Sequence, residues 1–100
     1  MAVEITWAPE AEETFDQNFN YLLNEWGDKQ AEKFVQQTDQ VIMRLQLFPE
    51  SYPPGSQSRK YRKARLNKYV VLFYAYYKTK KKITLVSFWN VKQDPHKLKY

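Results

Sequence analysis

The sequence has no cysteine, only two glycines and a single histidine, His96, among its 100 residues. Without cysteine, neither disulfides nor cysteine-based metal sites can form, which is consistent with a reducing compartment. Two glycines are too few for a glycine-rich phosphate loop, and the acidic residues do not have the spacing of metal ligands. His96 lies in a polar tail, where a solvated histidine is the ordinary interpretation. We therefore expect no metal and no cofactor, and any catalysis would have to use Lys, Arg and Tyr.

Long apolar stretches are also missing. No run approaches the roughly 20 residues of a membrane span, and the N-terminus lacks the basic and then apolar pattern of a signal peptide. A chain of 100 residues is long enough for one modest two-layer core but not for two cores. We expect a single domain over residues 1–100, cytoplasmic and without membrane contact.

Charge is distributed very unevenly along the chain. Residues 1–50 contain ten acidic and three basic side chains, a net charge of −7, whereas residues 51–100 contain one acidic and thirteen basic side chains, a net charge of +12. Such asymmetry points to a polyanionic partner, or to an acidic protein partner, for the C-terminal half.

The N-terminal half predicts one strand and two helices. Residues 2–7 alternate as a strand does, with Val3, Ile5 and Trp7 on one face. Two apolar stripes at helical spacing predict helices over roughly residues 10–26 and 28–48. The first stripe comprises Phe15, Phe19, Leu22, Leu23 and Trp26, and the second comprises Ala31, Phe34, Val35, Thr38, Val41, Ile42, Leu45 and Phe48.

Helix-terminating residues support these boundaries. Pro9 suits the first position of a helix, and Gly27 suits a C-terminal stop. Asp28 is a suitable N-cap for the second helix, and Pro49 ends it. The joint between the helices is therefore only one or two residues long, which predicts an antiparallel helical hairpin.

The C-terminal half predicts three strands. After a loop over residues 50–58, strand-like runs cover residues 61–66, 69–77 and 82–90. Two residues, Asn67 and Lys68, separate the first two runs, and Asn tolerates the positive φ of a tight hairpin. The fold predicted is α+β in the order β-α-α-β-β-β. It is a small, mainly antiparallel four-stranded sheet with the helical hairpin on one face and the first strand placed beside the last.

A two-residue loop fixes a register in which Leu66 faces Tyr69 and Ala64 faces Val71. Opposed residues share a sheet face, and faces alternate along each strand. The face predicted to form the core collects Ala64, Leu66, Tyr69, Val71 and Phe73. The face predicted to lie away from the helices collects Tyr61, Lys63, Arg65, Val70, Leu72 and Tyr74. We expect this second face to be an aromatic and aliphatic platform with cations at one edge.

Six cations gather in ten residues before and within the first hairpin. The candidate residues for binding nucleic acid or another target are Arg59, Lys60, Arg62, Lys63, Arg65 and Lys68. Isolated exposed cations on a strand usually serve only to prevent edge pairing. A cluster of this density beside aromatic residues favours a binding surface instead.

Four segments together resemble the RelE/ParE superfamily of toxins from type II toxin–antitoxin systems. They are the opening ITWAPEAEETF, the loop LFPESYPPG, the hairpin KARLNKYVVLFYAYY and the segment ITLVSFWNVKQDP. The resemblance extends over essentially the whole chain. It implies a small cytoplasmic toxin, neutralised by an antitoxin encoded beside it, that acts either on ribosome-bound mRNA or on DNA gyrase.

The ribonuclease branch of that superfamily implies a metal-independent attack of the ribose 2′-OH, assisted by Lys, Arg and Tyr side chains. By the resemblance, Lys63 matches a catalytic Lys, Arg65 matches a cation on the same face, and Lys92 falls near a family Arg. Two positions depart from that branch, because Tyr61 stands where another Lys is expected and Val70 stands where the main phosphate-binding Arg is expected. Tyr100 is two positions later than the C-terminal Tyr of that branch.

Three functions stay open at this point. The chain is a ParE-like toxin that poisons gyrase by contact, a RelE-like mRNA interferase that uses Lys63, Arg65 and Lys92, or an inactive member that only binds its antitoxin. The platform predicts the antitoxin-binding residues as Leu72, Tyr74 and Trp89, because two helices cover only one face of a small sheet. If the chain is an mRNA interferase, Val70→Arg is predicted to raise ribosome-dependent cleavage, because it restores a cation between Arg65 and the platform.

Overall fold

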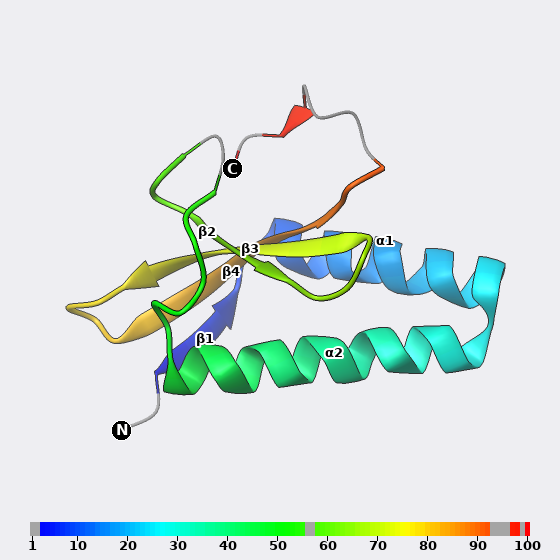
Figure 1. Ribbon diagram of the computed structural model, residues 1–100, viewed down its shortest axis with the longest axis horizontal. Coiled ribbons are helices and arrows are strands. Elements are labelled where there is room, and N and C mark those ends of the chain that lie inside the picture. The colour runs from blue at the N-terminus through cyan, green and yellow to red at the C-terminus, as the bar shows by residue number, and fades with distance from the viewer. Residues whose placement is uncertain (1–2, 56–57, 93–96, 99) are drawn as a thin grey trace.

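The computed structural model describes residues 3–55, 58–92, 97, 98 and 100, and shows two helices and four strands in the predicted order (Figure 1). The elements are β1 (Glu4–Trp7), α1 (Pro9–Trp26), α2 (Asp28–Leu47), β2 (Arg62–Arg65), β3 (Val70–Tyr77) and β4 (Lys82–Asn90). Ala2 and His96, for which a strand start and a solvated surface position are predicted, lie outside the described residues.

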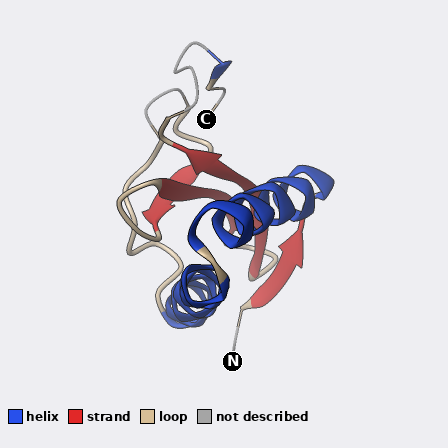
Figure 2. Cartoon of the chain, turned by 90° about the vertical axis from the view of Figure 1, so that its right-hand side faces the viewer, coloured by secondary structure: helices blue, strands red, loops and turns tan. Residues whose placement is uncertain are grey.

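The four strands form one sheet in the order β1-β4-β3-β2. Strand β1 lies beside β4, as predicted, and the two run parallel, whereas β3 is antiparallel to both β4 and β2. The sheet is therefore mixed, with two antiparallel pairings and one parallel pairing. Figure 2 shows both helices on one side of this sheet, which confirms the predicted two-layer arrangement.

The helical hairpin turns at Gly27, whose φ of 89° lies in the region that favours glycine. Its backbone N–H donates to the carbonyl oxygens of Leu22 and Leu23 at 3.1 Å and so closes α1. The predicted N-cap is wrong by one residue, because Gly27 also occupies the cap of α2 and Asp28 is the first helical residue. There the Asp28 carboxylate still complements the positive end of the helix dipole. Among the described residues, no helix is long and apolar enough to cross a membrane.

Aromatic rings fill the centre of the layer between helices and sheet. The Phe15 ring contacts Phe34 at a centroid distance of 5.0 Å and Phe88 at 5.3 Å, and Trp7 stacks on Phe88 at 5.5 Å. Val3 is buried, and Ile5 and Trp7 pack against the same cluster, so the predicted inward face of β1 is confirmed. Each such ring pair adds about 0.5–1.5 kcal/mol beyond its buried area.

The predicted register between β2 and β3 is wrong by one residue. Ala64 lies opposite Leu72 and not opposite Val71, and the Leu66 N–H donates to the Val70 carbonyl at 3.0 Å. The hairpin loop thus contains three residues, 67–69, and not two. The physical reason is the Asn67 side chain, whose Oδ1 accepts hydrogen bonds from the Tyr69 N–H at 2.8 Å and the Val70 N–H at 3.0 Å.

A shift of one residue exchanges the two faces of β3. Val70, Leu72 and Tyr74 point to the helices and are 2%, 0% and 0% exposed, whereas Val71 and Phe73 point to the other side. The prediction that Leu72 and Tyr74 are exposed to a partner is therefore wrong.

Strand β4 contains an irregularity that neither its length nor its alternation predicts. Phe73 pairs with Ser87, whereas the next residue, Tyr74, pairs with Leu85. Val86 is therefore an extra residue in β4 that has no partner in β3. This bulge lets Leu85 and Phe88, three residues apart, both face the helices in the core cluster.

Helix α1 closes the edge of the sheet where β1 ends. Beyond Leu85, no strand of the described residues lies beside β4 on the edge away from β3, and two polar side chains of α1 occupy the place of a ladder partner. The Thr14 Oγ1 accepts a hydrogen bond from the Phe88 N–H at 2.8 Å, and the Asn18 Nδ2 donates to the Phe88 carbonyl at 3.1 Å. These contacts fix α1 along β4.

Removing the hydroxyl of Thr14 should destabilise the fold. Thr14→Val keeps the shape of the side chain but leaves the N–H of buried Phe88 without an acceptor, which costs about 1–3 kcal/mol. Urea unfolding should therefore show a lower midpoint at an unchanged slope. Thr79→Val, in the exposed β3–β4 turn, is the matched control and should change the midpoint little. Equal midpoints for both variants would contradict the role of Thr14.

The Tyr74 hydroxyl should make stability depend on pH at alkaline values. It donates to the Pro49 carbonyl at 2.8 Å, and burial, only partly opposed by nearby Arg62, raises the pKa of Tyr74 from 10.0 to about 12. Folding favours the protonated phenol, so this stabilisation is complete below about pH 10 and is lost as the pH rises through 12.

Tyr74→Phe should therefore lower stability at pH 7 by about 0.5–1.5 kcal/mol, because the hydrogen bond is lost. It should also flatten the decline in stability between pH 10 and 12, measured as denaturation midpoints against pH. Tyr77→Phe, at an exposed position of the same strand, is the control. A decline as steep in Tyr74→Phe as in the wild type would exclude Tyr74 as its source.

Candidate functional site

The sheet face opposite the helices, here called the back face, carries its own apolar cluster. Val71, Phe73 and Tyr100 are buried there, and the partly buried residues packed against them are Tyr61, Val86, Trp89 and Leu98. Trp89 thus lies on the face where the sequence predicts an antitoxin contact, although its predicted neighbours Leu72 and Tyr74 do not. The back face remains an aromatic and aliphatic platform, built from the alternate residues of β3.

Tyr100 covers the middle of the back face. Its ring lies 5.0 Å from the Tyr61 ring and 5.4 Å from the Phe73 ring, and its hydroxyl donates to the Glu10 carboxylate at 2.8 Å. Burial and this hydrogen bond raise the pKa of the Tyr100 hydroxyl well above its usual value. The hydroxyl therefore keeps its proton at neutral pH, donates a hydrogen bond to the Glu10 carboxylate and is not a base.

Two of the predicted catalytic cations lie at the edge of the back face. Lys63 pairs with Phe73 and Arg65 with Val71, so both side chains share the face of those residues, as predicted. The Arg65 Nη1 donates to the carbonyl oxygens of Asn67 at 3.4 Å and of Lys68 at 3.2 Å, which holds the guanidinium beside the hairpin loop.

Of the other predicted target-binding cations, Arg59, Lys60 and Lys68 are exposed, and the Lys60 Nζ lies 5.5 Å above the Tyr61 ring. Arg62 lies apart from them. Its Nη1 donates to the carbonyl oxygens of Tyr52 at 2.7 Å and Glu50 at 3.3 Å, so its guanidinium anchors the loop that follows α2.

Lys92, the third predicted catalytic residue, lies beyond the end of β4 and away from the edge that carries Lys63. Its Nζ lies 5.0 Å above the Tyr69 ring, and its side chain lines a pocket on the side of the helices. The structure therefore brings Lys63 and Arg65 to one face and places Lys92 with Tyr69 at another site.

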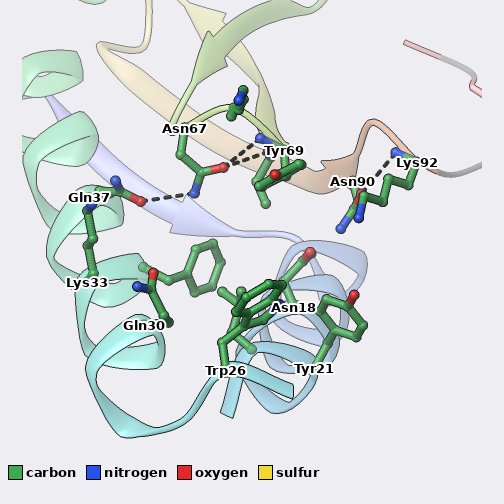
Figure 3. Close-up of a pocket in the computed structure, with 14 residues that line it drawn as sticks. Asn18, Tyr21, Trp26, Gln30, Lys33, Gln37, Asn67, Tyr69, Asn90 and Lys92 are labelled. Carbon is green, nitrogen blue, oxygen red and sulfur yellow. Dashed lines mark hydrogen bonds between the residues drawn. The ribbon is translucent and has the colours of Figure 1, made fainter. Parts of the chain in front are cut away.

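That pocket, here called the hairpin pocket, has a volume of about 390 Å³. It lies between the turn of the helical hairpin, the β2–β3 loop and the end of β4 (Figure 3). Its lining residues are Asn18, Tyr21, Leu22, Trp26, Gln30, Lys33, Phe34, Gln37, Asn67, Lys68, Tyr69, Val70, Asn90 and Lys92. Sequence reasoning missed this site, because the apolar stripe of α1 places Trp26 in the core, whereas its side chain is 67% exposed.

Val70 lies at the base of the hairpin pocket and belongs to the core cluster under the helices. The back face therefore has no side chain from the position where the ribonuclease branch is expected to place its phosphate-binding Arg. The predicted placement of an arginine here is also wrong, because position 70 faces the core and would not extend the platform beside Arg65.

Residues 5–95 match the family described as the ParE toxin of the type II toxin–antitoxin system parDE. No curated protein sequence is similar enough to count as a relative.

Several solved structures share the fold at low sequence identity. A chain of the chromosomal ParDE toxin–antitoxin system from P. aeruginosa superposes with a TM-score of 0.73 at 16% identity, over 89% of this chain and 96% of that one. A chain of the E. coli DinJ–YafQ toxin–antitoxin complex gives 0.63 at 10% identity, over 92% and 96%. A chain of the YoeB–YefM complex from Staphylococcus aureus gives 0.58 at 18% identity, over 89% and 97%.

Proposed function

Because the chain belongs to the ParE toxin family of type II toxin–antitoxin systems, we propose that it arrests growth by binding DNA gyrase through the back face, without cutting RNA. The observation that carries this proposal is the burial of Val70, which is 2% exposed beneath the helices. The position at which the ribonuclease branch is expected to hold its phosphate is thereby part of the core.

Nuclease chemistry requires several donors around one phosphate group, because each must stabilise the same developing charge. Lys63 and Arg65 share the back face, but Lys92 contacts Tyr69 on the side of the helices. The Arg65 guanidinium also donates to two loop carbonyls. This arrangement favours binding to the surface of a protein partner over catalysis at a single phosphate group.

The back face has the properties of a protein-binding surface. It combines the rings of Tyr61 and Trp89 with the cations Lys60, Lys63 and Arg65 along one edge. Tyr, Trp and Arg are enriched in protein interfaces, and a basic edge speeds encounter with an acidic partner.

The chain has a cognate antitoxin as its partner, as a toxin of this family does. We propose that the antitoxin neutralises it by covering the back face. Trp89 and Tyr61 are its contacts there, in place of the buried Leu72 and Tyr74.

An mRNA interferase is the second candidate, because Lys63, Arg65 and the Tyr100 ring lie on the same face. Tyr100 keeps its proton at neutral pH, but its raised pKa and its hydrogen bond to Glu10 make it a weak general acid, because an efficient one has a pKa near the operating pH. Two assays separate the candidates. After induction, primer extension on cellular mRNA should show no codon-phased cuts, whereas purified protein should block supercoiling by gyrase. Cleaved mRNA with normal supercoiling would refute the gyrase proposal. If neither cleaved mRNA nor inhibition of supercoiling is detected, the protein is an inactive member that only binds its antitoxin.

The double variant Lys63→Ala/Arg65→Ala should lose toxicity while staying folded. Both side chains lie at the edge of the back face, so the free energy of unfolding should change by only about 0.5 kcal/mol. Loss of two interface charges should weaken inhibition of supercoiling by at least about tenfold.

Lys80→Ala/Lys81→Ala removes the same charge from the exposed β3–β4 turn and is the matched control. The inhibitory concentration in the gyrase assay is the measurement. If both double variants lose inhibition equally, net charge and not the back face accounts for it.

A further inference from the structure

The hairpin pocket lies on the side of the helices, and the gyrase-binding proposal does not use it. Its base is apolar, formed by Leu22, Phe34 and Val70. Exposed aromatic rings surround the base, with Tyr21 45%, Trp26 67% and Tyr69 46% exposed. Solvent-exposed rings around an apolar hollow are typical of a binding site, because they lose unfavourable contact with water when a ligand enters.

The rim of the hairpin pocket is cationic. Lys33, Lys68 and Lys92 line it, and among the described residues no acidic side chain lines it. Lys33 is one of only three basic residues in the otherwise acidic first half of the chain. Figure 3 shows Tyr21 and Trp26 on the helical side of the pocket, and Tyr69 and Lys92 on the side of the sheet. A ligand that enters between them meets positive charge from both sides.

The pocket is held in shape before any ligand binds. The Asn67 Nδ2 donates to the Gln37 Oε1 at 2.9 Å, which ties the β2–β3 loop to α2. The Oδ1 of the same Asn67 side chain accepts from the N–H groups of Tyr69 and Val70. A preformed site avoids the entropy cost of ordering loops on binding.

We infer that the hairpin pocket anchors the antitoxin, by taking a large apolar side chain from an acidic segment of that protein. The inference rests on the proposal that an antitoxin covers this chain, and it adds a second contact on the opposite side of the sheet. A volume of about 390 Å³ accommodates one or two side chains, and the three lysines then face carboxylates of the same segment.

A protein segment fits the pocket better than a nucleic acid does. Reading a base edge requires hydrogen-bonding groups at the base of the pocket, whereas Leu22, Phe34 and Val70 offer only hydrocarbon. The amide of Asn67 is occupied by its bonds to Gln37 and the loop. The site therefore selects for hydrophobic side chains and negative charge together, as in an amphipathic acidic helix.

The test measures binding of the purified antitoxin, encoded by the adjacent reading frame, to full-length toxin variants by surface plasmon resonance. Lys33→Glu should slow association and lower the salt dependence of binding, because it removes a cation from the rim. Trp26→Ala should speed dissociation by about tenfold or more, because it removes an aromatic anchor.

Matched controls separate the pocket from general charge and hydrophobicity. Lys29→Glu changes the same charge one turn earlier on α2, and Leu47→Ala truncates an equally exposed apolar side chain at the far end of that helix. Both positions lie outside the pocket lining, and both controls should bind antitoxin as the wild type does. In cells, Lys33→Glu and Trp26→Ala should still arrest growth, but co-expressed antitoxin should rescue it less well than it rescues the wild type and both controls.

Three results would overturn the inference. Wild-type affinity in both pocket variants would place the antitoxin elsewhere and leave the proposed function intact. Equal losses of antitoxin affinity in Lys29→Glu and Lys33→Glu would show that net charge, and not the pocket, accounts for the effect. Competition by a 20-nucleotide single-stranded RNA that is lost in Trp26→Ala would assign the pocket to RNA. If instead the wild-type toxin does not bind the antitoxin, the proposal that the antitoxin neutralises this chain is refuted, and the inference about the pocket is refuted with it.

Discussion

The Asn67 side chain is the constraint on which both surfaces of this protein depend. By accepting two backbone hydrogen bonds, it makes the β2–β3 loop three residues long and so decides which residues of β3 face the helices. Because side chains alternate along a strand, one residue more or less would exchange the core with the back face. The same amide donates to Gln37 and thereby sets one wall of the hairpin pocket.

Helix α1 has a second structural task besides covering the core. Strand β1 ends at Trp7, opposite Leu85, so among the described residues the last part of β4 pairs with β3 on one edge and with no strand on the other. Thr14 and Asn18 satisfy that edge with side-chain hydrogen bonds to Phe88. An open strand edge invites pairing with other chains, so these two polar residues both position the helical hairpin and protect the sheet from aggregation.

Patterns in the sequence predict the elements and their order well, because hydrophobic periodicity and the residues Pro9, Gly27 and Pro49 act locally. They fail where one side chain changes the backbone. Nothing in the alternation of β3 distinguishes a two-residue loop from a three-residue one, and only the Asn67 hydrogen bonds decide it. The bulge at Val86 and the exposure of Trp26 likewise depend on tertiary packing. Hence Lys63 and Arg65 are placed correctly from the sequence, whereas Leu72, Tyr74 and Val70 are not.

The two surfaces lie on opposite sides of one thin sheet, and this geometry affects how the toxin is controlled. A partner segment that covers the back face and continues around the β2–β3 loop reaches the hairpin pocket within the same chain. The second contact is then intramolecular and gains from a high effective concentration, so affinity rises without a larger patch at either site. Under the two proposals, inhibition and anchoring are separated, because the back face is proposed to meet the target and the hairpin pocket is not. Under these proposals, substitutions in the lining of the hairpin pocket would change antitoxin preference while Lys63 and Arg65, at the edge of the back face, stay the same.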